Sequence, residues 1–448
     1  MKLQLTTQSL IRPLIVLKKI ETSCPFCHGK SEVKIIIEDK KLFVIKNCPT
    51  CGIHRWLLSN NPKCFKRILE ENFRETEFPT NKFLIPLNSE KLWKILKIRY
   101  HSFLLSISEK CNSDCNICYM DNIPHKDISF KKIRETIDKL GKGKNILLFG
   151  GEPTVRKDLF KIIKYANKTG NRAIVFTNGL ELSNKKYVKK LKQSGISEIR
   201  ISFDGFREEI YQILRNDKTQ LYKKLLALKY LKEMKIPTTI SFTAVDGINI
   251  DQIPLILLFA IKFRDFIRGV TIIPFTPEGR VKIKVKKILS PIEVLNIVEE
   301  STLGKIKKEY VHEFNLFKDN VIKILFKLHL TKNTAPSPDI LFKIGSIKEL
   351  ISANELKKIN KNFSQKNYLL VIFRLFKSLL KEKEAFKIFL KFILNKFKLN
   401  ANIIPKNVLS FYILPIGSYF YLPGERETVN INFNPPHSIV YTGPGASV

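Results

Sequence analysis

The chain has 448 residues and a mass of 51.9 kDa, which is long enough for about two to three domains. Hydrophobic residues make up 44% and charged residues 27%, a globular and not a disordered composition. Lys and Arg outnumber Asp and Glu by 78 to 41, a formal net charge of +37. These values exclude an acidic tail protein, a collagen-like fibre and a small disulfide-stapled scaffold.

The positive charge is spread along the chain and is not gathered in one arm or stripe. We attribute it to a lysine-rich composition, expect no nucleic-acid partner, and keep a membrane or lipid surface as the alternative. Arg12 and Pro13 interrupt the only apolar run near the start, so no secretory signal is predicted. No window reaches the ~18 apolar residues of a membrane span. The sequence therefore predicts a cytoplasmic protein whose membrane association, if any, is peripheral.

Residues 1–99 are predicted to form an amino-terminal metal-binding unit and a linker. Cys24-Pro-Phe-Cys27 and Cys48-Pro-Thr-Cys51 are separated by 20 residues, the spacing of a four-thiolate site of the rubredoxin or zinc-ribbon kind. In a reducing compartment, clustered cysteines indicate metal ligands and not disulfides. We expect zinc in a structural role, with mononuclear iron in electron transfer as the alternative. Cys64 is unpaired and is predicted to be a core residue.

Residues 100–282 repeat a strand, loop and helix pattern, which predicts a parallel sheet with right-handed crossovers. The predicted strands are Phe103–Ser108, Asn145–Phe149, Arg172–Phe176, Glu198–Phe203, Thr238–Thr243 and Val270–Pro274. The predicted helices are Phe130–Leu140, Lys157–Asn167, Lys185–Gln193, Leu221–Met234 and Pro254–Phe263. Ser129 and Ser183 are the candidate helix N-caps.

Two further segments differ in composition. Residues 283–400 are rich in Lys and Phe and are predicted to be mostly helical, whereas residues 401–448 are rich in Tyr, Pro, Gly and Asn. The apolar faces between about Phe342 and Leu399 indicate a packed helical cap, with a membrane-surface or lipid-gating helix as the alternative. The tail is interpreted as either a lid over the barrel mouth or a disordered end.

A cysteine cluster, Cys111-Asn-Ser-Asp-Cys115-Asn-Ile-Cys118, follows the first strand of the predicted sheet. Three thiolates on one loop can hold three irons of a cubane 4Fe-4S cluster, which leaves the fourth iron open to bind substrate atoms. The alternative is an ordinary structural or electron-transfer cluster whose fourth ligand lies elsewhere.

Other strands of this region also end in polar or glycine-rich motifs. The second is followed by Gly150-Gly151-Glu152-Pro153, where paired glycines let the backbone approach a ligand and Glu152 offers an acceptor for an ammonium group. The third and fourth end in Thr177-Asn178-Gly179 and Ser202-Phe203-Asp204-Gly205, and the sixth leads into Gly279-Arg280. Ligands of such barrels lie at the carboxyl ends of the strands, so these motifs predict one site.

With these motifs in this order, residues 100–282 resemble the radical S-adenosylmethionine superfamily. The resemblance implies an α/β fold with a partial (β/α)6 TIM-type barrel. Cys111, Cys115 and Cys118 would ligate the 4Fe-4S cluster, whose fourth iron would chelate the amino and carboxylate groups of S-adenosylmethionine. One electron would then release a 5′-deoxyadenosyl radical that abstracts hydrogen from an unactivated carbon.

The resemblance also implies which residues contact S-adenosylmethionine. Gly150, Gly151 and Glu152 would receive its amino group, and the backbone around Ile117 and Tyr119 would meet the adenine. Ser202 and Asp204 are the candidates for the ribose. Asn178 is a further cofactor-binding candidate because it ends the third strand.

The paired Cys-x2-Cys motifs and the turn Asp246-Gly247-Ile248-Asn249 make the chain similar to one group within the superfamily, the tetraether lipid synthases and dihydropterin methyltransferases. Arg268-Gly269-Val270 and Gly279-Arg280 around the sixth strand add to this likeness. Members of the group usually carry cysteines for auxiliary clusters after the barrel. Here no cysteine follows Cys118, so the group's own reactions, joining two lipid tails or methylating a pterin, are a lead and not an expectation.

We therefore predict a radical S-adenosylmethionine enzyme, an oxidoreductase or transferase, that acts on a small molecule or a lipid. Its electron donor is expected to be a reductase or a ferredoxin-type protein. A peptide- or RNA-modifying enzyme of the same superfamily is one alternative, and a non-catalytic iron–sulfur or zinc protein is the other.

Overall fold

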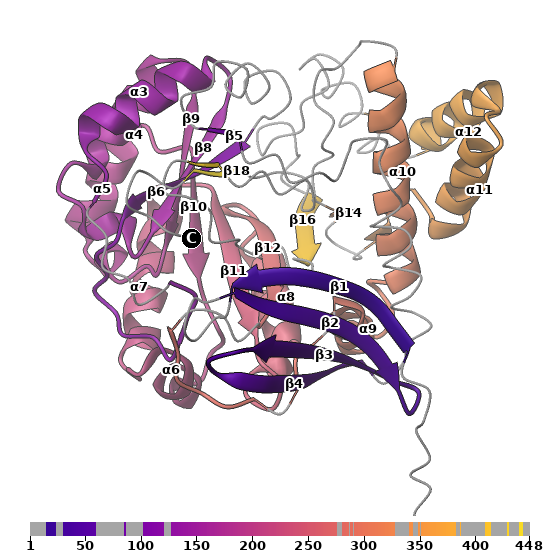
Figure 1. Ribbon diagram of the computed structural model, residues 1–448. Helices are drawn as coiled ribbons and strands as arrows, with labels where there is room; N and C mark the ends of the chain where they lie inside the picture. Colours follow the sequence, from indigo (N-terminus) through magenta and orange to yellow (C-terminus); the bar gives the residue numbers. More distant parts are fainter. Residues whose placement is uncertain are drawn as a thin grey trace, which may run out of the picture.

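The computed structural model describes residues 15–23, 30–59, 85–86, 102–120, 127–275, 280–285, 287–289, 291–327, 340–343, 348–349, 351–381, 386, 408–413, 428–429 and 439–441. Within them a large mixed sheet forms the centre, a small antiparallel sheet lies beside it, and helices cover the periphery (Figure 1). Cys24, Cys27, Cys64, the linker helix and most of the tail lie outside the described residues.

Six parallel strands form the middle of the large sheet, in the order of the sequence: β6 (Ser102–Ser108), β8 (Asn145–Gly150), β9 (Arg172–Thr177), β10 (Glu198–Ser202), β11 (Thr238–Ala244) and β12 (Ile267–Pro274). Between them run α3 (Phe130–Leu140), α4 (Leu159–Lys168), α5 (Lys185–Gln193), α6 (Glu208–Arg215), α7 (Gln220–Glu233) and α8 (Ile253–Lys262). Short 3-10 turns lie at Pro153–Val155, Glu181–Ser183 and Ile250–Gln252. The predicted partial (β/α)6 barrel is confirmed.

The strands are apolar on both faces because the parallel sheet is covered on both. Side chains such as Leu105, Leu148 and Val175 pack with the helices in one large core. The alternate positions Leu104, Leu147 and Ile174 join a smaller cluster on the other face. This alternation holds the strand ends in register, so that the loops that follow them meet at one edge.

The helix starts test the predicted caps. Ser129 caps α3, and its side chain accepts a hydrogen bond from Lys132 N at 3.2 Å, as predicted. The prediction for Ser183 is wrong. Asn184 caps α5 by accepting from Lys186 N at 2.9 Å, while the Ser183 hydroxyl donates to Leu180 O. Asn binds the first free backbone amides of a helix at least as well as Ser, and here it stands one residue closer to the helix.

Strands from the carboxy-terminal part extend both edges of the parallel sheet. β16 (Val408–Ile413) pairs parallel with β12, and β18 (Ile439–Tyr441) pairs parallel with β6 at the opposite edge. β14 (Ile340–Lys343) and β15 (Lys348–Glu349) continue the sheet beyond β16, and β17 (Thr428–Val429) pairs with β5 (Ile85–Pro86). The described parts of the tail therefore complete the sheet, a role that neither interpretation of the tail included.

The amino-terminal sheet is an antiparallel meander of β1 (Ile15–Ser23), β2 (Lys30–Glu38), β3 (Lys41–Cys48) and β4 (Gly52–Ser59). Its register pairs Ser23 with Lys30 and Cys48 with Gly52, so the first and third hairpin connections leave from the same end of the sheet. The meander meets the rest of the chain where Ile288 N donates to Leu57 O at 3.3 Å.

The helical part after the barrel consists of α9 (Pro291–Ser301), α10 (Lys308–Lys327), α11 (Ala353–Ser364) and α12 (Tyr368–Lys381). The expectation of a helical region is therefore confirmed. The antiparallel pair α11 and α12 lies at the outer side of α10, away from the barrel (Figure 1). Among the described residues, no helix is both long enough and apolar enough to cross a bilayer.

Candidate functional site

The cysteine loop leaves the carboxyl end of β6 and returns as β7 (Ile117–Cys118), which pairs with β13 (Arg280–Val281). Cys111 is exposed, and Cys115 and Cys118 are half-buried. Arg280 stands directly opposite Cys118 in this pairing. The sixth-strand motif and the cysteine loop, far apart in sequence, are therefore neighbours in the fold.

Each of the three sulfurs has a polar neighbour. Arg280 Nη2 donates to Cys118 Sγ at 3.2 Å, and the Asn178 amide lies 3.9 Å from Cys111 Sγ. Cys115 Sγ is hydrogen-bonded to Ser113 Oγ at 3.2 Å and also receives the Arg215 guanidinium. Donors and positive charge around sulfur favour the thiolate, which is the form that binds iron.

The three cysteine side chains are not grouped around one point as the ligands of a single metal ion would be. No three His, Cys, Asp or Glu side chains within the described residues converge as they would around one ion. A cubane cluster makes another demand, because each thiolate binds its own iron. Although the Cys111 side chain reaches the surface, desolvation of its sulfur by the surrounding loop raises the pKa of the metal-free thiol to about 11, so cluster binding would have to displace its proton.

Gly150 and Gly151 are required by the chain's own backbone. A Cβ at Gly150 would lie 2.1 Å from Ser108 O, and one at Gly151 would lie 2.5 Å from Lys110 O. Gly151 N and Glu152 N donate to these two carbonyls at 2.6 and 2.7 Å. The glycines thus press the end of β8 against the start of the cysteine loop. We expected these glycines to let the backbone approach a ligand. In these contacts the backbone instead approaches residues 108–110 of the chain itself.

Glu152 ties the strand ends together. Its carboxylate is fully buried and accepts from Thr154 N and Thr154 Oγ1, from Thr177 Oγ1 at 2.7 Å and from Asn178 N at 2.6 Å. Burial raises the pKa of Glu152 even though these donors oppose the rise. Among the described residues Oε2 has one donor, Asn178 N, so this oxygen has room to accept a second hydrogen bond.

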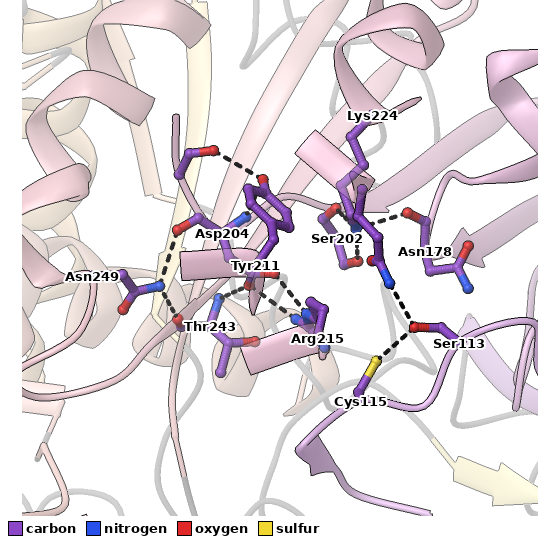
Figure 2. A network of polar contacts seen from close by, with 12 residues as sticks. Ser113, Cys115, Asn178, Ser202, Asp204, Tyr211, Arg215, Lys224, Thr243 and Asn249 are labelled. Carbon is purple, nitrogen blue, oxygen red and sulfur yellow. Dashed lines mark hydrogen bonds and ion pairs between the residues drawn. The ribbon is translucent and has the colours of Figure 1, made fainter. Parts of the chain in front are cut away.

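Lys224 joins the ends of β9 and β10 (Figure 2). It lies on α7 with no exposed surface, and its ammonium donates to Asn178 O and Ser202 O at 2.8 Å and to Ser202 Oγ at 2.9 Å. Burial, followed by the charge of Arg215, lowers its pKa to about 8. The site therefore holds a buried cation at the two strand ends where Asn178 and Ser202 were predicted to bind the cofactor.

Asp204 does not fit the predicted contact with ribose. It is fully buried, and Arg215 binds both of its carboxylate oxygens at 2.8 and 2.9 Å (Figure 2). Burial alone would raise the pKa of Asp204, but the charge and hydrogen bonds of Arg215 outweigh it and the net shift is downward. Asn249 and Tyr211 bond to the Asp204 backbone from either side. Asp204 is thus an ion-pair partner that positions Arg215 beside Cys115.

Ile117 and Tyr119 flank Cys118 in the sequence. The Ile117 side chain is buried against Leu214, Val245 and Phe275, whereas Tyr119 is half-exposed. Their backbone lies beside the cysteine loop, where the resemblance implies that adenine binds.

The sequence-based prediction missed Arg215, Lys224 and Gln220, and gave Arg280 no role. One signal was available for Lys224, because it occupies the buried stripe of α7 together with Leu221, Ala227 and Leu228. Gln220 starts the same stripe, and its amide donates to Ser113 Oγ at 2.8 Å. A charged residue at an apolar helical position indicates a buried partner.

In the predicted amino-terminal metal unit, Cys48 is buried at the end of β3 and Cys51 precedes β4. Cys51 N points at Cys48 Sγ at 3.4 Å, an amide-to-sulfur contact that suits a metal-bound thiolate. Cys24 and Cys27, the other two predicted ligands, lie outside the described residues.

The barrel region is similar to known proteins. Residues 105–260 match the model of the Radical SAM superfamily, so the chain carries a radical SAM domain. Its curated relatives are enzymes, and they include a dihydropterin methyltransferase, as the narrower resemblance implied.

Two relatives illustrate the extent of the similarity. The chain is 30% identical over 312 residues to 7,8-dihydro-6-hydroxymethylpterin dimethyltransferase of Methanocaldococcus jannaschii, which covers 65% of this chain and 60% of that protein. It is 36% identical over 164 residues to Fe-coproporphyrin III synthase of Methanosarcina barkeri, covering 34% of this chain and 38% of that protein. The chain thus spans less than two thirds of the length of either relative.

Among solved structures, Streptococcus suis SuiB bound to S-adenosylmethionine is similar with a TM-score of 0.40 and 17% identity, over 59% of this chain and 69% of that one.

Proposed function

We propose that the protein is a radical S-adenosylmethionine enzyme whose site lies at the carboxyl ends of β6 to β10. The observation that carries the proposal is the meeting of the cysteine loop, Gly150-Gly151-Glu152 and the Asn178 and Ser202 strand ends at one edge of the sheet. A cluster and S-adenosylmethionine bound there would supply the one-electron cleavage that yields a 5′-deoxyadenosyl radical.

In this proposal the chain's residues bind the cluster, neutralise the charge of its thiolates and orient S-adenosylmethionine. Cys111, Cys115 and Cys118 hold three irons, and Arg215 and Arg280 offset the negative charge of the bound thiolates. The Gly150 and Gly151 carbonyls and Glu152 Oε2 accept hydrogen bonds from the methionine amino group. The Lys224 ammonium holds the Asn178 and Ser202 strand ends in place, Asn178 and Ser202 line the ribose, and the backbone at Ile117 and Tyr119 supports the adenine.

We further propose that Cys24, Cys27, Cys48 and Cys51 hold one zinc ion in a structural role. The shared end of the two hairpins and the Cys51 amide contact support this assignment. Iron in electron transfer is the competing content of the site. Metal analysis separates them, since Cys48→Ser should remove one zinc per chain and leave the cluster iron unchanged.

The substrate we propose is a small molecule or a lipid with an unactivated carbon–hydrogen bond, and the electron donor is a reductase or ferredoxin-type protein. The likeness to the dihydropterin dimethyltransferase makes a pterin the first compound to assay. Peptide or RNA substrates are the less well supported alternative, and for RNA the reason is that the positive charge forms no single stripe along the sequence.

Electron paramagnetic resonance of the anaerobically reconstituted protein tests the proposal. The reduced protein should hold about four irons, and its signal should change when S-adenosylmethionine binds the open iron. Cys115→Ala should lose the cluster, whereas Cys64→Ala, which changes a cysteine outside the motifs, should keep it. A fully loaded cluster whose spectrum ignores S-adenosylmethionine would contradict the proposal.

A further inference from the structure

The outer helix α12 exposes a row of apolar side chains. The side chains of Leu369, Ile372, Phe373, Phe376 and Leu380 are 84, 64, 63, 55 and 63% exposed, and we call these five residues the α12 stripe. They recur at three- and four-residue intervals and so share one face of the helix. Isolated exposed apolar residues are ordinary, but a continuous stripe on one helix marks a binding surface.

The stripe is not the face by which α12 packs onto the protein. Val371 and Leu379 on the other side of the helix are 4 and 3% exposed, and Val371 joins Ile359 and Phe363 of α11 in a small core. Arg374 ties α12 to Glu355 of α11 at 3.0 Å. The helix is therefore held from one side and is apolar on the opposite side as well.

A helix with an ordinary solvent face looks different. In α5, Val188 and Leu191 are buried, whereas Lys186, Lys189 and Lys190 are exposed. In α12 the exposed side carries the stripe, together with Lys377 and Lys381. The exposed side of α12 is therefore not an ordinary charged face in contact with water.

The charge around the stripe indicates what covers it. Residues 353–381 contain seven basic side chains (Lys357, Lys358, Lys361, Lys366, Arg374, Lys377 and Lys381) and one acidic side chain (Glu355), a net charge of +6. Glu355 is already paired with Arg374. A second copy of this chain would bring two such hairpins together, and the like charges would repel each other.

An anionic bilayer satisfies both features of the hairpin. The headgroups attract lysines that flank an apolar face, and the acyl boundary accepts the apolar side chains. The hairpin lies at the outer edge of the molecule, beyond α10, where a flat surface can reach it (Figure 1).

We propose that the α11–α12 hairpin docks the protein on an anionic membrane surface, with the α12 stripe inserted at the level of the headgroups. The proposal concerns a surface remote from the cysteine loop and does not depend on the proposed chemistry.

Flotation of the reconstituted full-length protein with vesicles tests the docking. Vesicles containing phosphatidylglycerol should carry the protein, and phosphatidylcholine vesicles should carry much less. The double variant Phe373→Ser and Phe376→Ser should weaken partitioning about a hundredfold, at about tenfold for each ring withdrawn from the bilayer. The control Tyr222→Ser and Leu258→Ser changes two side chains that are 66 and 60% exposed on α7 and α8, and it should partition like the wild type.

A second pair of variants tests whether the lysines beside the α12 stripe contribute to membrane binding. Lys377→Glu and Lys381→Glu should weaken binding by at least about fivefold for each lysine, whereas Lys189→Glu and Lys190→Glu on α5 change the net charge equally and should have little effect. Equal partitioning of all variants, or no binding by a monomeric wild type, would overturn the proposal. The proposal would also fail if the wild type formed a dimer in sedimentation, or bound an acidic protein, and the Phe373→Ser and Phe376→Ser variant lost that association. In that case the variant would still bind vesicles as the wild type does.

Discussion

The ion pair of Asp204 and Arg215 is buried, and Arg215 also reaches Cys115 of the cysteine loop. Removing one partner of a buried pair leaves the other charge uncompensated, so we expect Arg215→Met to lower the free energy of unfolding by ~3–5 kcal/mol. The double variant Arg215→Met and Asp204→Asn removes both charges and should recover part of this loss. Urea unfolding checks both, and a single variant within about 1 kcal/mol of the wild type would refute the structural role of the pair.

Lys224 makes stability depend on pH. Burial and Arg215 lower its pKa from the ordinary 10.5 to about 8 in the folded chain. Between pH 8 and 10.5 the unfolded chain holds a proton on Lys224 that the folded chain has lost, so the free energy of unfolding rises with pH across this window. Below pH 8 Lys224 is protonated in both states, and its contribution does not change with pH.

The variant Lys224→Met lacks this titration. The stability of the wild type relative to the variant should therefore grow by up to about 3 kcal/mol between pH 8 and 10.5. Urea unfolding of both proteins at several pH values measures the difference. A difference that stays constant over that range would show that Lys224 titrates normally.

Asp204 is a residue whose partner could not be predicted from the sequence. A carboxylate at a strand end is expected to meet a ligand, and the sequence gives no sign that Arg215, eleven positions later, turns back to it. Such a contact depends on the path of α6, a helix that we did not predict. The cysteine motif is local, by contrast, so its residues could be named in advance.

At the scale of elements, the join between β8 and the cysteine loop depends on Gly151. A Cβ there would lie 2.5 Å from Lys110 O and 2.8 Å from Glu109 O, both backbone atoms that cannot turn away. We expect Gly151→Ala to displace the loop, lower stability by ~1–3 kcal/mol and reduce the iron bound on reconstitution.

Gly304→Ala is the matched control for this substitution. At Gly304 the φ angle is +71° and a Cβ would meet nothing within 4 Å, so only backbone strain of about 1 kcal/mol is added. Its iron content should equal that of the wild type. If Gly151→Ala also binds full iron, the contact with residues 109–110 does not shape the loop.

The parallel strands were predictable within a few residues because burial on both faces leaves a continuous apolar run. β8 was predicted as Asn145–Phe149 and spans Asn145–Gly150, whereas β12 starts at Ile267, three residues before its predicted start. Gly269 interrupts the pattern there. The strands β16 and β18 were missed because their partners are more than a hundred residues away in sequence, and local patterns do not carry pairing.

At the scale of the whole molecule, the tail protects both edges of the parallel sheet. β16 covers β12, and β18 covers β6. An unpaired edge strand is a template for association with other chains. We therefore expect a chain ending at Asn400 to unfold at a lower temperature and to aggregate. A truncated chain that stays monomeric with the melting temperature of the full chain would contradict this role of the tail.

The central claim is that the strand ends of this barrel convert S-adenosylmethionine into 5′-deoxyadenosine. The most direct measurement is the amount of deoxyadenosine formed by the anaerobically reconstituted protein with dithionite, compared with Cys118→Ala and with Cys64→Ala. We predict formation by the wild type and by Cys64→Ala, and none by Cys118→Ala. No deoxyadenosine from a wild-type protein with a full, reduced cluster, in the presence and absence of candidate substrates, would contradict the claim and leave metal binding alone.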